Sequence, residues 1–330
     1  MRFSIFNVPL ERRLQTLSVL IYALVTPFAL ICAFYLIVIP IFYGFTVPYL
    51  IWIIYWDKRH ETGGYKWKFV RNLKLWKYFK DYFPISLRAS SKLDPEKNYI
   101  FGIHPHGIIS IGAFCNFGTN ANGIDHAFPG VNIHLLTLDS NFRIPFLREI
   151  LLSLGIGSVS KKSCTNILNS GKGQSICIVI GGAEESLDAH PGNNEITLKN
   201  RKGFVKLALN NGASLVPVYS FGENDVYDQV SNPRGSYIRR IQTKIKNITG
   251  IAPPLIRGRG VFSYDFGLLP QRHPIVSVIG SPIDIPKVNN PSEELIDHYH
   301  KLYIDSLNEL FENYKKEFHE IPEDTHLKIN

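Results

Sequence analysis

The hydrophobic pattern divides the chain into a long apolar run near the N-terminus and a longer region of alternating short apolar segments. No charged residue occurs between Arg13 and Asp57, and residues 17–55 are nearly continuously apolar. A helix needs about 20 apolar residues to cross a bilayer, so the run is long enough for two helices, with Pro40 near the break. It is also longer than the roughly 7–15 apolar residues of a signal peptide. We therefore expect residues 1–57 to form an N-terminal tail and a two-helix transmembrane hairpin.

Basic residues flank both ends of the apolar run. Arg12 and Arg13 precede it, and Lys58 and Arg59 follow it. Basic flanks favour the cytosolic side of a membrane, so both termini and the rest of the chain are predicted to be cytosolic. A hairpin buried in the protein core is the alternative.

The segment that follows, residues 58–95, mixes basic and aromatic side chains. Its lysines and arginines alternate with Trp67, Phe69, Trp76, Tyr78 and Phe79. This composition beside a membrane segment is typical of a helix lying in the lipid interface. A solvated charged helix would have the same basic residues, but the two tryptophans favour the membrane interface.

From residue 96 onward the pattern alternates between strands and helices. We predict strands at 99–103, 133–138, 176–180, 215–219 and 275–279, and helices at 145–154, 163–169 and 202–210. Such alternation predicts an α/β fold with a mixed, largely parallel sheet flanked by helices. Near the end, Asn290 and Pro291 are expected to cap and open a final helix. We assign residues 96–330 to one catalytic domain.

Charge and cysteine content narrow the class of protein. The net charge of +8 favours anionic partners, but no nucleic-acid-binding motif accompanies the basic residues, so no nucleic-acid partner is expected. The four cysteines, Cys32, Cys115, Cys164 and Cys177, lack metal-type spacing. Reduced thiols in a cytosol-facing protein are the simplest interpretation.

The turn after the first predicted strand of the domain is the strongest candidate for chemistry. An apolar run ends at His104-Pro105-His106-Gly107. Proline fixes φ and glycine permits unusual dihedrals, so this turn can hold imidazoles rigidly at the end of a strand. Histidine exchanges protons near neutral pH, and we interpret the turn as the source of a general base. A metal-binding pair and a purely structural pair remain alternatives.

Two further segments carry charged residues in positions that suit a site. The strand at 176–180 is followed by Gly181-Gly182-Ala183-Glu184-Glu185, where a carboxylate could hold an imidazole in the correct tautomer. Exposed loop charges would give the same pattern. Arg201 and Lys202 begin a predicted helix, and cations at a helix N-terminus favour an anion site. Neither a Gly-x-Ser-x-Gly elbow nor a phosphate-binding P-loop occurs.

Six short motifs, taken together, resemble the diacylglycerol acyltransferase type 2 family, which includes monoacylglycerol and wax-ester acyltransferases. They are Tyr82-Phe83-Pro84, His104-Pro105-His106-Gly107, Phe142-Arg143-x-Pro145-x-x-Arg148-Glu149, Gly181-Gly182-Ala183-x-Glu185, Arg201-Lys202-Gly203-Phe204 and Phe221-Gly222-Glu223-Asn224. The resemblance implies an endoplasmic-reticulum membrane enzyme that transfers a fatty acyl group from acyl-CoA to diacylglycerol and forms triacylglycerol. Monoacylglycerol and fatty alcohols are the alternative acceptors within the family.

We therefore expect His106 to act as the base, with His104 sharing that role or shaping the turn. Glu185 is expected to orient the imidazole, and the Gly107 N–H to donate to the oxyanion. The residues expected at the acyl-CoA phosphates are Arg143, Arg148, Arg201 and Lys202, and further family-motif positions are Pro105, Gly203, Phe204, Glu223 and Asn224. No metal or bound cofactor is expected, because acyl-CoA serves as cosubstrate.

The related glycerolipid acyltransferases use a His-x-x-x-x-Asp motif, which occurs here at His134 and Asp139. We interpret this match as coincidental, since residues five apart in a strand point to opposite faces. Two other classes remain as rivals: a non-catalytic membrane lipid-binding protein and a metallohydrolase. Homo-oligomerisation and association with lipid droplets stay open.

Overall fold

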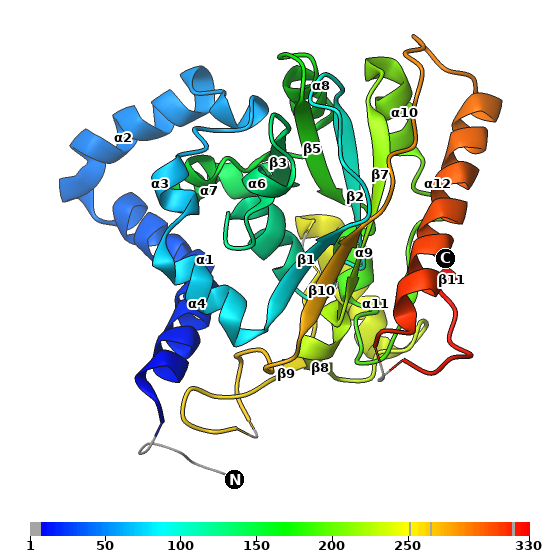
Figure 1. Cartoon of the computed structure of the whole chain (residues 1–330). Helices are drawn as coiled ribbons and strands as arrows, with labels where there is room; N and C mark the ends of the chain where they lie inside the picture. Colours follow the sequence, from blue (N-terminus) through cyan, green and yellow to red (C-terminus); the bar gives the residue numbers. More distant parts are fainter. Residues whose placement is uncertain (1–7, 251, 265, 319–320) are drawn as a thin grey trace.

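The computed structural model describes residues 8–250, 252–264, 266–318 and 321–330. Its centre is a seven-stranded sheet in the order β1-β10-β7-β2-β5-β3-β4 (Figure 1). All neighbouring strands in it are parallel except β10 and β7, which confirms a mixed, mostly parallel sheet. The strands of this sheet are β1 Ile85–Ala89, β2 Tyr99–His104, β3 Asn132–Thr137, β4 Gly157–Ser158, β5 Gln174–Val179, β7 Ser214–Phe221 and β10 Ile275–Ile279.

Two short strand pairs lie outside the main sheet. β6 (Glu195–Ile196) pairs with β11 (Lys328–Ile329), and β8 (Asp228–Gln229) pairs with β9 (Ile256–Arg257). The helices that follow the N-terminal region are α5 Ile111–Ala113, α6 Ile124–Ala127, α7 Leu147–Leu154, α8 Lys161–Leu168, α9 Gly182–Ser186, α10 Gly203–Asn211, α11 Tyr237–Thr249 and α12 Glu293–Lys315. The strands and helices predicted for the domain are all present, with shifts of one or two residues at most ends.

Each face of the sheet has its own hydrophobic core because side chains alternate along a strand. On β2, Phe101 and Ile103 pack into the core on one face with Phe114. Ile100 packs into the core on the other face, which is covered by α8, α10 and α12 and includes Tyr303. Residues 102 and 104 share the face of residue 100, so the strand period places His104 on the side of α12.

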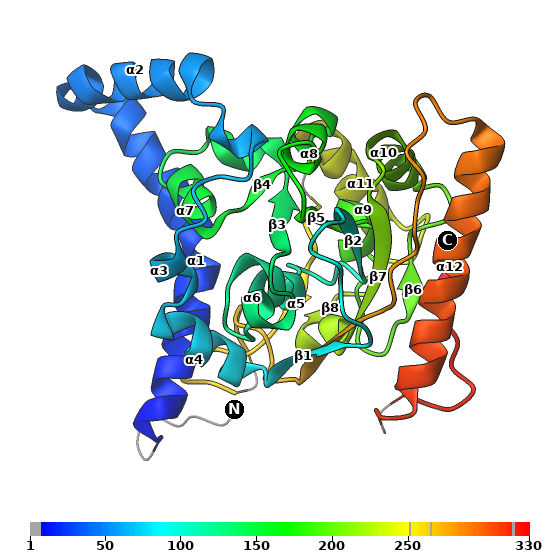
Figure 2. The same cartoon turned by 45° about the horizontal axis from the view of Figure 1, so that its top comes forward.

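Among the described residues, one helix is long and apolar enough to cross a membrane, α1 (Leu10–Val38). The helix ends at Val38, and a short 3-10 turn begins at Pro40, where the break is predicted. The next helix, α2 (Tyr43–Ile51), has nine residues and continues as a π-helical turn to Trp56. It leaves the end of α1 at an angle in both views (Figures 1 and 2). The expected pair of spanning helices is therefore not seen as such, because α2 is shorter than the about 20 residues that a bilayer requires.

The basic and aromatic segment after α2 joins the core of the same fold. It contains α3 (Lys68–Arg71), α4 (Lys74–Tyr82) and β1. We expected its aromatic face to contact lipid, but Trp76, Phe79 and Tyr82 are buried against the sheet and α1. Trp67 and Phe69 remain exposed. Burial against protein replaces burial in lipid here, because the same amphipathic pattern suits both surroundings.

The final helix begins two residues later than predicted. Ser292, and not Asn290, is the N-cap of α12, and its hydroxyl accepts a hydrogen bond from the Leu295 N–H at 3.3 Å. A serine oxygen satisfies one of the free N–H groups of the first turn. Pro291 therefore lies before the helix and not at its first position.

Candidate active site

Three adjacent strands bring the polar side chains of the motifs to one edge of the sheet. β2 lies between β5 and β7, and all three run in the same direction. β2 ends at His104, β5 leads into α9 with Glu185, and β7 is followed by Glu223. The carboxyl ends of parallel strands are where α/β proteins commonly form their sites. The topology therefore unites three motifs that lie far apart in the sequence.

His106 has the protonation state of a base. Its Nδ1 lies 3.0 Å from the Gly107 carbonyl oxygen. A carbonyl can only accept, so Nδ1 carries the hydrogen and Nε2 has a free lone pair. The side chain is half-buried, and burial lowers its pKa below the usual value for histidine. The neutral ring is thus favoured near pH 7 and can accept a proton at Nε2.

His104 has the opposite tautomer and lies deeper. Its Nε2 is 3.1 Å from the Tyr303 hydroxyl, which donates to the Gly102 carbonyl at 3.0 Å. The single hydroxyl proton is used on Gly102, so His104 must donate from Nε2. Its Nδ1 is buried without a hydrogen-bond partner. Burial lowers the pKa of His104 to about 3, so the ring is neutral.

Tyr303 of α12 belongs to this site, although no sequence motif indicated it. The absence of a side chain at Gly102 leaves room for the Tyr303 hydroxyl, because a Cβ there would lie 2.1 Å from the hydroxyl oxygen. A glycine inside a strand often indicates the close approach of another group. That glycine was the signal in the sequence, but only the fold could show that α12 fills the space.

Glu185 meets the histidine turn through its main chain. One carboxylate oxygen accepts from the His106 N–H at 2.7 Å, and the other accepts from the Thr197 N–H at 2.6 Å. No hydrogen bond joins this carboxylate to either imidazole, so the expected contact with the ring is not made. Burial raises the pKa of Glu185 to about 7, although both N–H bonds favour its charged form. Glu185 holds the backbone that carries His106.

Glu223 supports the same turn from the other side. Its carboxylate accepts from the main-chain N–H groups of Ile111 at 2.6 Å and Gly112 at 2.8 Å. Gly107 has φ of 60°, and a Cβ on it would lie 2.7 Å from Cγ of Glu223. Glycine is therefore required at position 107 both by its left-handed backbone and by its closeness to Glu223. Burial raises the pKa of Glu223 to about 8.

The basic residues expected at the cosubstrate lie in different surroundings. Arg201 is exposed beside α9, with one guanidinium nitrogen 3.5 Å from the Gly181 carbonyl. Lys202 pairs with Asp297 at 2.5 Å. Arg143 is exposed and pairs with Asp139 at 3.3 Å. Arg201 is thus the member of this set that lies beside a site segment.

Arg148 cannot contact a phosphate in this structure, contrary to expectation. Its side chain is 1% exposed and forms an ion pair with buried Asp57 at 2.8 Å. It also pairs with Glu149 at 3.1 Å. Asp57 follows the helical region of α2, so Arg148 joins the segment after α2 to α7. Its guanidinium is enclosed by protein and is used for this structural contact.

The remaining motif residues support the turn or its neighbours. Phe204 is buried and packs edge to face on Tyr303, with ring centroids 4.8 Å apart, and Gly203 begins α10 beside it. Asn224 donates to the Asn193 carbonyl at 2.7 Å. Pro105 follows His104 through a cis peptide bond. These residues shape the site without supplying a titratable group.

The literal His-x-x-x-x-Asp match does not form a dyad. Nδ1 of His134 is shared between the carbonyl oxygens of Gly63 and Gly155, at 3.1 and 3.0 Å. Asp139 instead contacts Ser158 and Arg143. In the part of the chain that the structure describes, no three His, Cys, Asp or Glu side chains are grouped as metal ligands would be.

The apolar helix α1 reaches the turn that holds His106. Tyr22 of α1 packs against Phe79 and Phe114, and its hydroxyl donates to the Ile109 carbonyl at 3.3 Å. Beyond Tyr22, α1 exposes large apolar side chains that include Leu24, Phe28, Ile31 and Phe34. The candidate site therefore lies directly beside the helix that can enter a membrane.

Comparison with known proteins identifies the class that this fold and site define. A sequence model of the family described as diacylglycerol acyltransferase matches residues 35–330, and the chain belongs to this family.

Individual relatives refine this picture. The chain is 66% identical over 329 residues to diacylglycerol O-acyltransferase 2 of Dictyostelium discoideum, covering 100% of this chain and 99% of the relative. It is 48% identical over 286 residues to the human protein of the same name, covering 86% and 74% of the two chains. Human 2-acylglycerol O-acyltransferase 1 is 45% identical over 329 residues, with 96% of each chain covered. A matching crystal structure, a 1-acyl-sn-glycerophosphate acyltransferase from Thermotoga maritima, has 13% identity and a TM-score of 0.42, covering 91% and 97%.

Proposed function

We propose that this protein transfers a fatty acyl group from acyl-CoA to the free hydroxyl of diacylglycerol and forms triacylglycerol. The observation that carries the proposal is the 66% identity, over the whole chain, to a diacylglycerol O-acyltransferase 2. The position of the histidine turn beside α1 agrees with a lipid acceptor, because a greasy alcohol would arrive from the membrane.

In this mechanism His106 is the base. An aliphatic alcohol is far too weakly acidic to ionise first, so its proton must leave as the oxygen attacks the thioester carbonyl. Nε2 of His106 accepts that proton, while the Nδ1–H bond to the Gly107 carbonyl keeps the ring in the required tautomer. The thiolate of coenzyme A then leaves and takes up the proton from the imidazolium.

Backbone groups are suited to stabilise the tetrahedral intermediate. The Gly107 N–H makes no hydrogen bond within the described residues, so it is free to donate to the oxyanion. Glu185 and Glu223 fix the main chain on both sides of it. We place His104 in a supporting role, because it is fully buried whereas His106 is half-buried.

The acceptor and the location belong to the same proposal. Monoacylglycerol is the second candidate acceptor, because a 2-acylglycerol O-acyltransferase is 45% identical over nearly its whole length. We further propose an endoplasmic-reticulum membrane protein whose α1–α2 region enters the bilayer and leaves both termini in the cytosol. The basic residues that flank this region support that orientation.

The test uses His106→Ala, His106→Gln and the native protein in microsomes with labelled acyl-CoA and a panel of acceptors. From known catalytic triads, loss of the base should lower kcat on the order of 10³-fold or more. Thin-layer analysis of the products identifies the acceptor. Native-like activity in both variants would remove His106 from the mechanism, and the absence of acyl-CoA-dependent ester from the native protein would reject the function.

A further inference from the structure

An open groove of about 600 Å³ lies between α11 and the segment around α9. Four of its lining side chains are cationic, Arg234, Arg239, Arg240 and Lys244, and Glu184 is the one carboxylate. The neutral polar side chains of Thr243 and Asn247 complete this wall. Such a surface carries a clear excess of positive charge and suits an anion.

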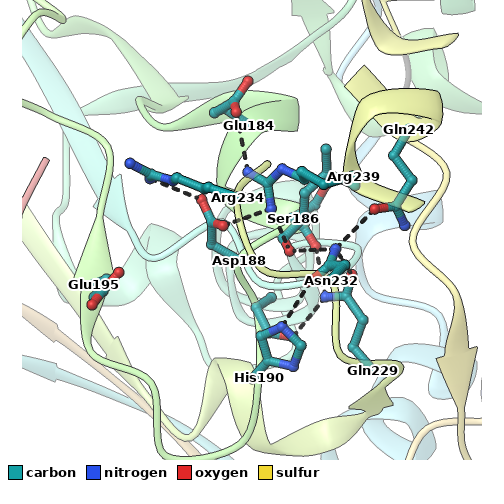
Figure 3. Close-up of polar contacts among 12 residues, drawn as sticks. Glu184, Ser186, Asp188, His190, Glu195, Gln229, Asn232, Arg234, Arg239 and Gln242 are labelled. Carbon is teal, nitrogen blue, oxygen red and sulfur yellow. Dashed lines mark hydrogen bonds and ion pairs between the residues drawn. The ribbon is translucent and has the colours of Figure 1, made fainter. Parts of the chain in front are cut away.

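The charges at the inner side of the groove are already neutralised. Figure 3 shows Arg239 between Glu184 and Asp188, with N–O distances of 3.2 and 2.7 Å. Lys246 also pairs with Glu184. Arg234 also pairs with Asp188, at 3.3 Å (Figure 3). This network fixes α11 against α9 and leaves the groove itself cationic.

Arg240 and Lys244 have no ion pair with any described residue. They are exposed, and their spacing of four residues puts them on the same face of α11. Two neighbouring unpaired cations over a groove repel each other, and an anionic ligand would relieve this repulsion. They are therefore the side chains available to a bound molecule.

The groove is one short helix away from the histidine turn. Glu184 lines the groove, while the next residue, Glu185, binds the His106 N–H. In both views α11 lies beside α9 and away from α1 and α2 (Figures 1 and 2). A ligand in the groove would thus approach His106 from the side opposite to the apolar helices.

We propose that this groove binds the phosphate groups of coenzyme A, with Arg240 and Lys244 as direct contacts and Arg234 at the rim. The inference rests on the proposed function, because it supplies the site for the water-soluble half of the acyl donor. Charge-assisted hydrogen bonds from arginine and lysine are strong phosphate contacts. The long pantetheine arm would then pass α9 and bring the thioester to His106.

The experiment compares Arg240→Gln/Lys244→Gln with native protein, purified in detergent, and with two controls. Lys301→Gln replaces an exposed lysine on α12, and Arg201→Gln/Lys202→Gln tests the alternative cation pair. We expect the α11 double variant to raise KM for acyl-CoA about tenfold or more, with kcat and KM for diacylglycerol nearly unchanged. Thermal unfolding checks that each variant is folded.

Direct binding separates this inference from the proposed function. Coenzyme A titrated into the native protein should bind about tenfold more tightly than dephospho-coenzyme A, and the α11 double variant should lose this difference. This measurement holds even if no ester is formed. Unchanged coenzyme A affinity in the α11 variant would overturn the proposal, as would loss of affinity only in Arg201→Gln/Lys202→Gln.

An anionic lipid headgroup also carries a phosphate group, so a vesicle-binding experiment is needed to distinguish a headgroup site from a coenzyme A site. Vesicles of phosphatidylcholine with and without phosphatidylserine are mixed with native and variant protein. If the α11 double variant loses only its preference for phosphatidylserine and keeps its coenzyme A affinity, the groove is a headgroup site and the proposal is wrong. We expect the native protein and the α11 double variant to bind each kind of vesicle equally well.

Discussion

The Glu185 carboxylate accepts a 2.7 Å hydrogen bond from the main-chain N–H of His106 and does not contact the ring. A carboxylate placed in this way positions the turn and leaves the imidazole to its bond with the Gly107 carbonyl. Glu185 is therefore a positioning residue, and the Nδ1–H tautomer of His106 is held without an acidic partner. This distinguishes it from the Ser-His-Asp arrangement, in which the acid binds Nδ1.

Replacement of Glu185 by Gln should damage the turn. A glutamine amide must point a donor at the N–H of either His106 or Thr197, so one buried donor loses its acceptor. We expect the free energy of unfolding to fall by about 1–3 kcal/mol and kcat to fall at least about tenfold. Denaturation and steady-state kinetics in detergent measure both. Glu96→Gln is the control, because its carboxylate is exposed and, among the described residues, forms an ion pair with Lys172 alone; equal behaviour of the two variants would contradict the positioning role.

Replacement of Tyr303 by Phe should remove two buried hydrogen bonds. The Gly102 carbonyl loses the hydroxyl donor, and the His104 Nε2–H loses its acceptor. The expected loss in the free energy of unfolding is about 1–3 kcal/mol. Tyr299→Phe on the same helix is a matched control, since no hydrogen bond of its hydroxyl is seen among the described residues, and it should cost less than about 0.5 kcal/mol. Equal losses in the two variants would show that the Tyr303 hydroxyl contributes nothing specific.

The pH dependence of stability should reflect Glu223. Its pKa is raised to about 8 by burial, above the ordinary value of 4.5. Between these pH values the native protein retains a proton that the unfolded chain releases, so the contribution of Glu223 to stability is lost as pH rises. Other buried groups, including His104 and Lys66, also titrate, but they are common to the native protein and Glu223→Gln.

The measurement is the melting temperature of both proteins between pH 5 and 8.5. On raising the pH, the native protein should lose at least about 2 °C relative to Glu223→Gln, since the unfolding entropy of a chain of this length makes each kcal/mol correspond to roughly 1–2 °C. Parallel curves for the two proteins would show that Glu223 keeps an ordinary pKa in the fold.

The ion pair between Arg148 and Asp57 should be important for stability and not for cosubstrate binding. Removal of Arg148 leaves the Asp57 carboxylate buried without its cation, and loss of one partner of a buried pair typically costs about 3–5 kcal/mol. Arg143→Ala is the control, because that residue is 81% exposed and surface pairs contribute about 0–1 kcal/mol. Chemical denaturation measures the difference. A change in KM for acyl-CoA with unchanged stability in Arg148→Ala would restore the phosphate role instead.

The sequence predicted much of the local structure because period-two and helical patterns report burial directly. The five strands, the helices between them and the break at Pro40 were all indicated by alternation, glycine and proline. The N-cap of α12 was misplaced by two residues, because asparagine and serine are both good caps and only the backbone geometry chooses between them. The aromatic face of α4 was assigned to lipid, because its pattern does not distinguish a bilayer from a protein core.

By itself, the sequence determined that a basic protein with a long apolar N-terminal run carries a histidine turn at the end of a buried strand, followed by two separate glutamate motifs. The tertiary structure decided what each polar group contacts: Glu185 binds main chain, Arg148 binds Asp57, and Tyr303 binds His104. The physical reason is that hydrophobic periodicity is a property of neighbouring residues, whereas a hydrogen bond requires atoms from distant segments to meet within about 3 Å. Only the order and direction of the strands in the sheet establish those meetings.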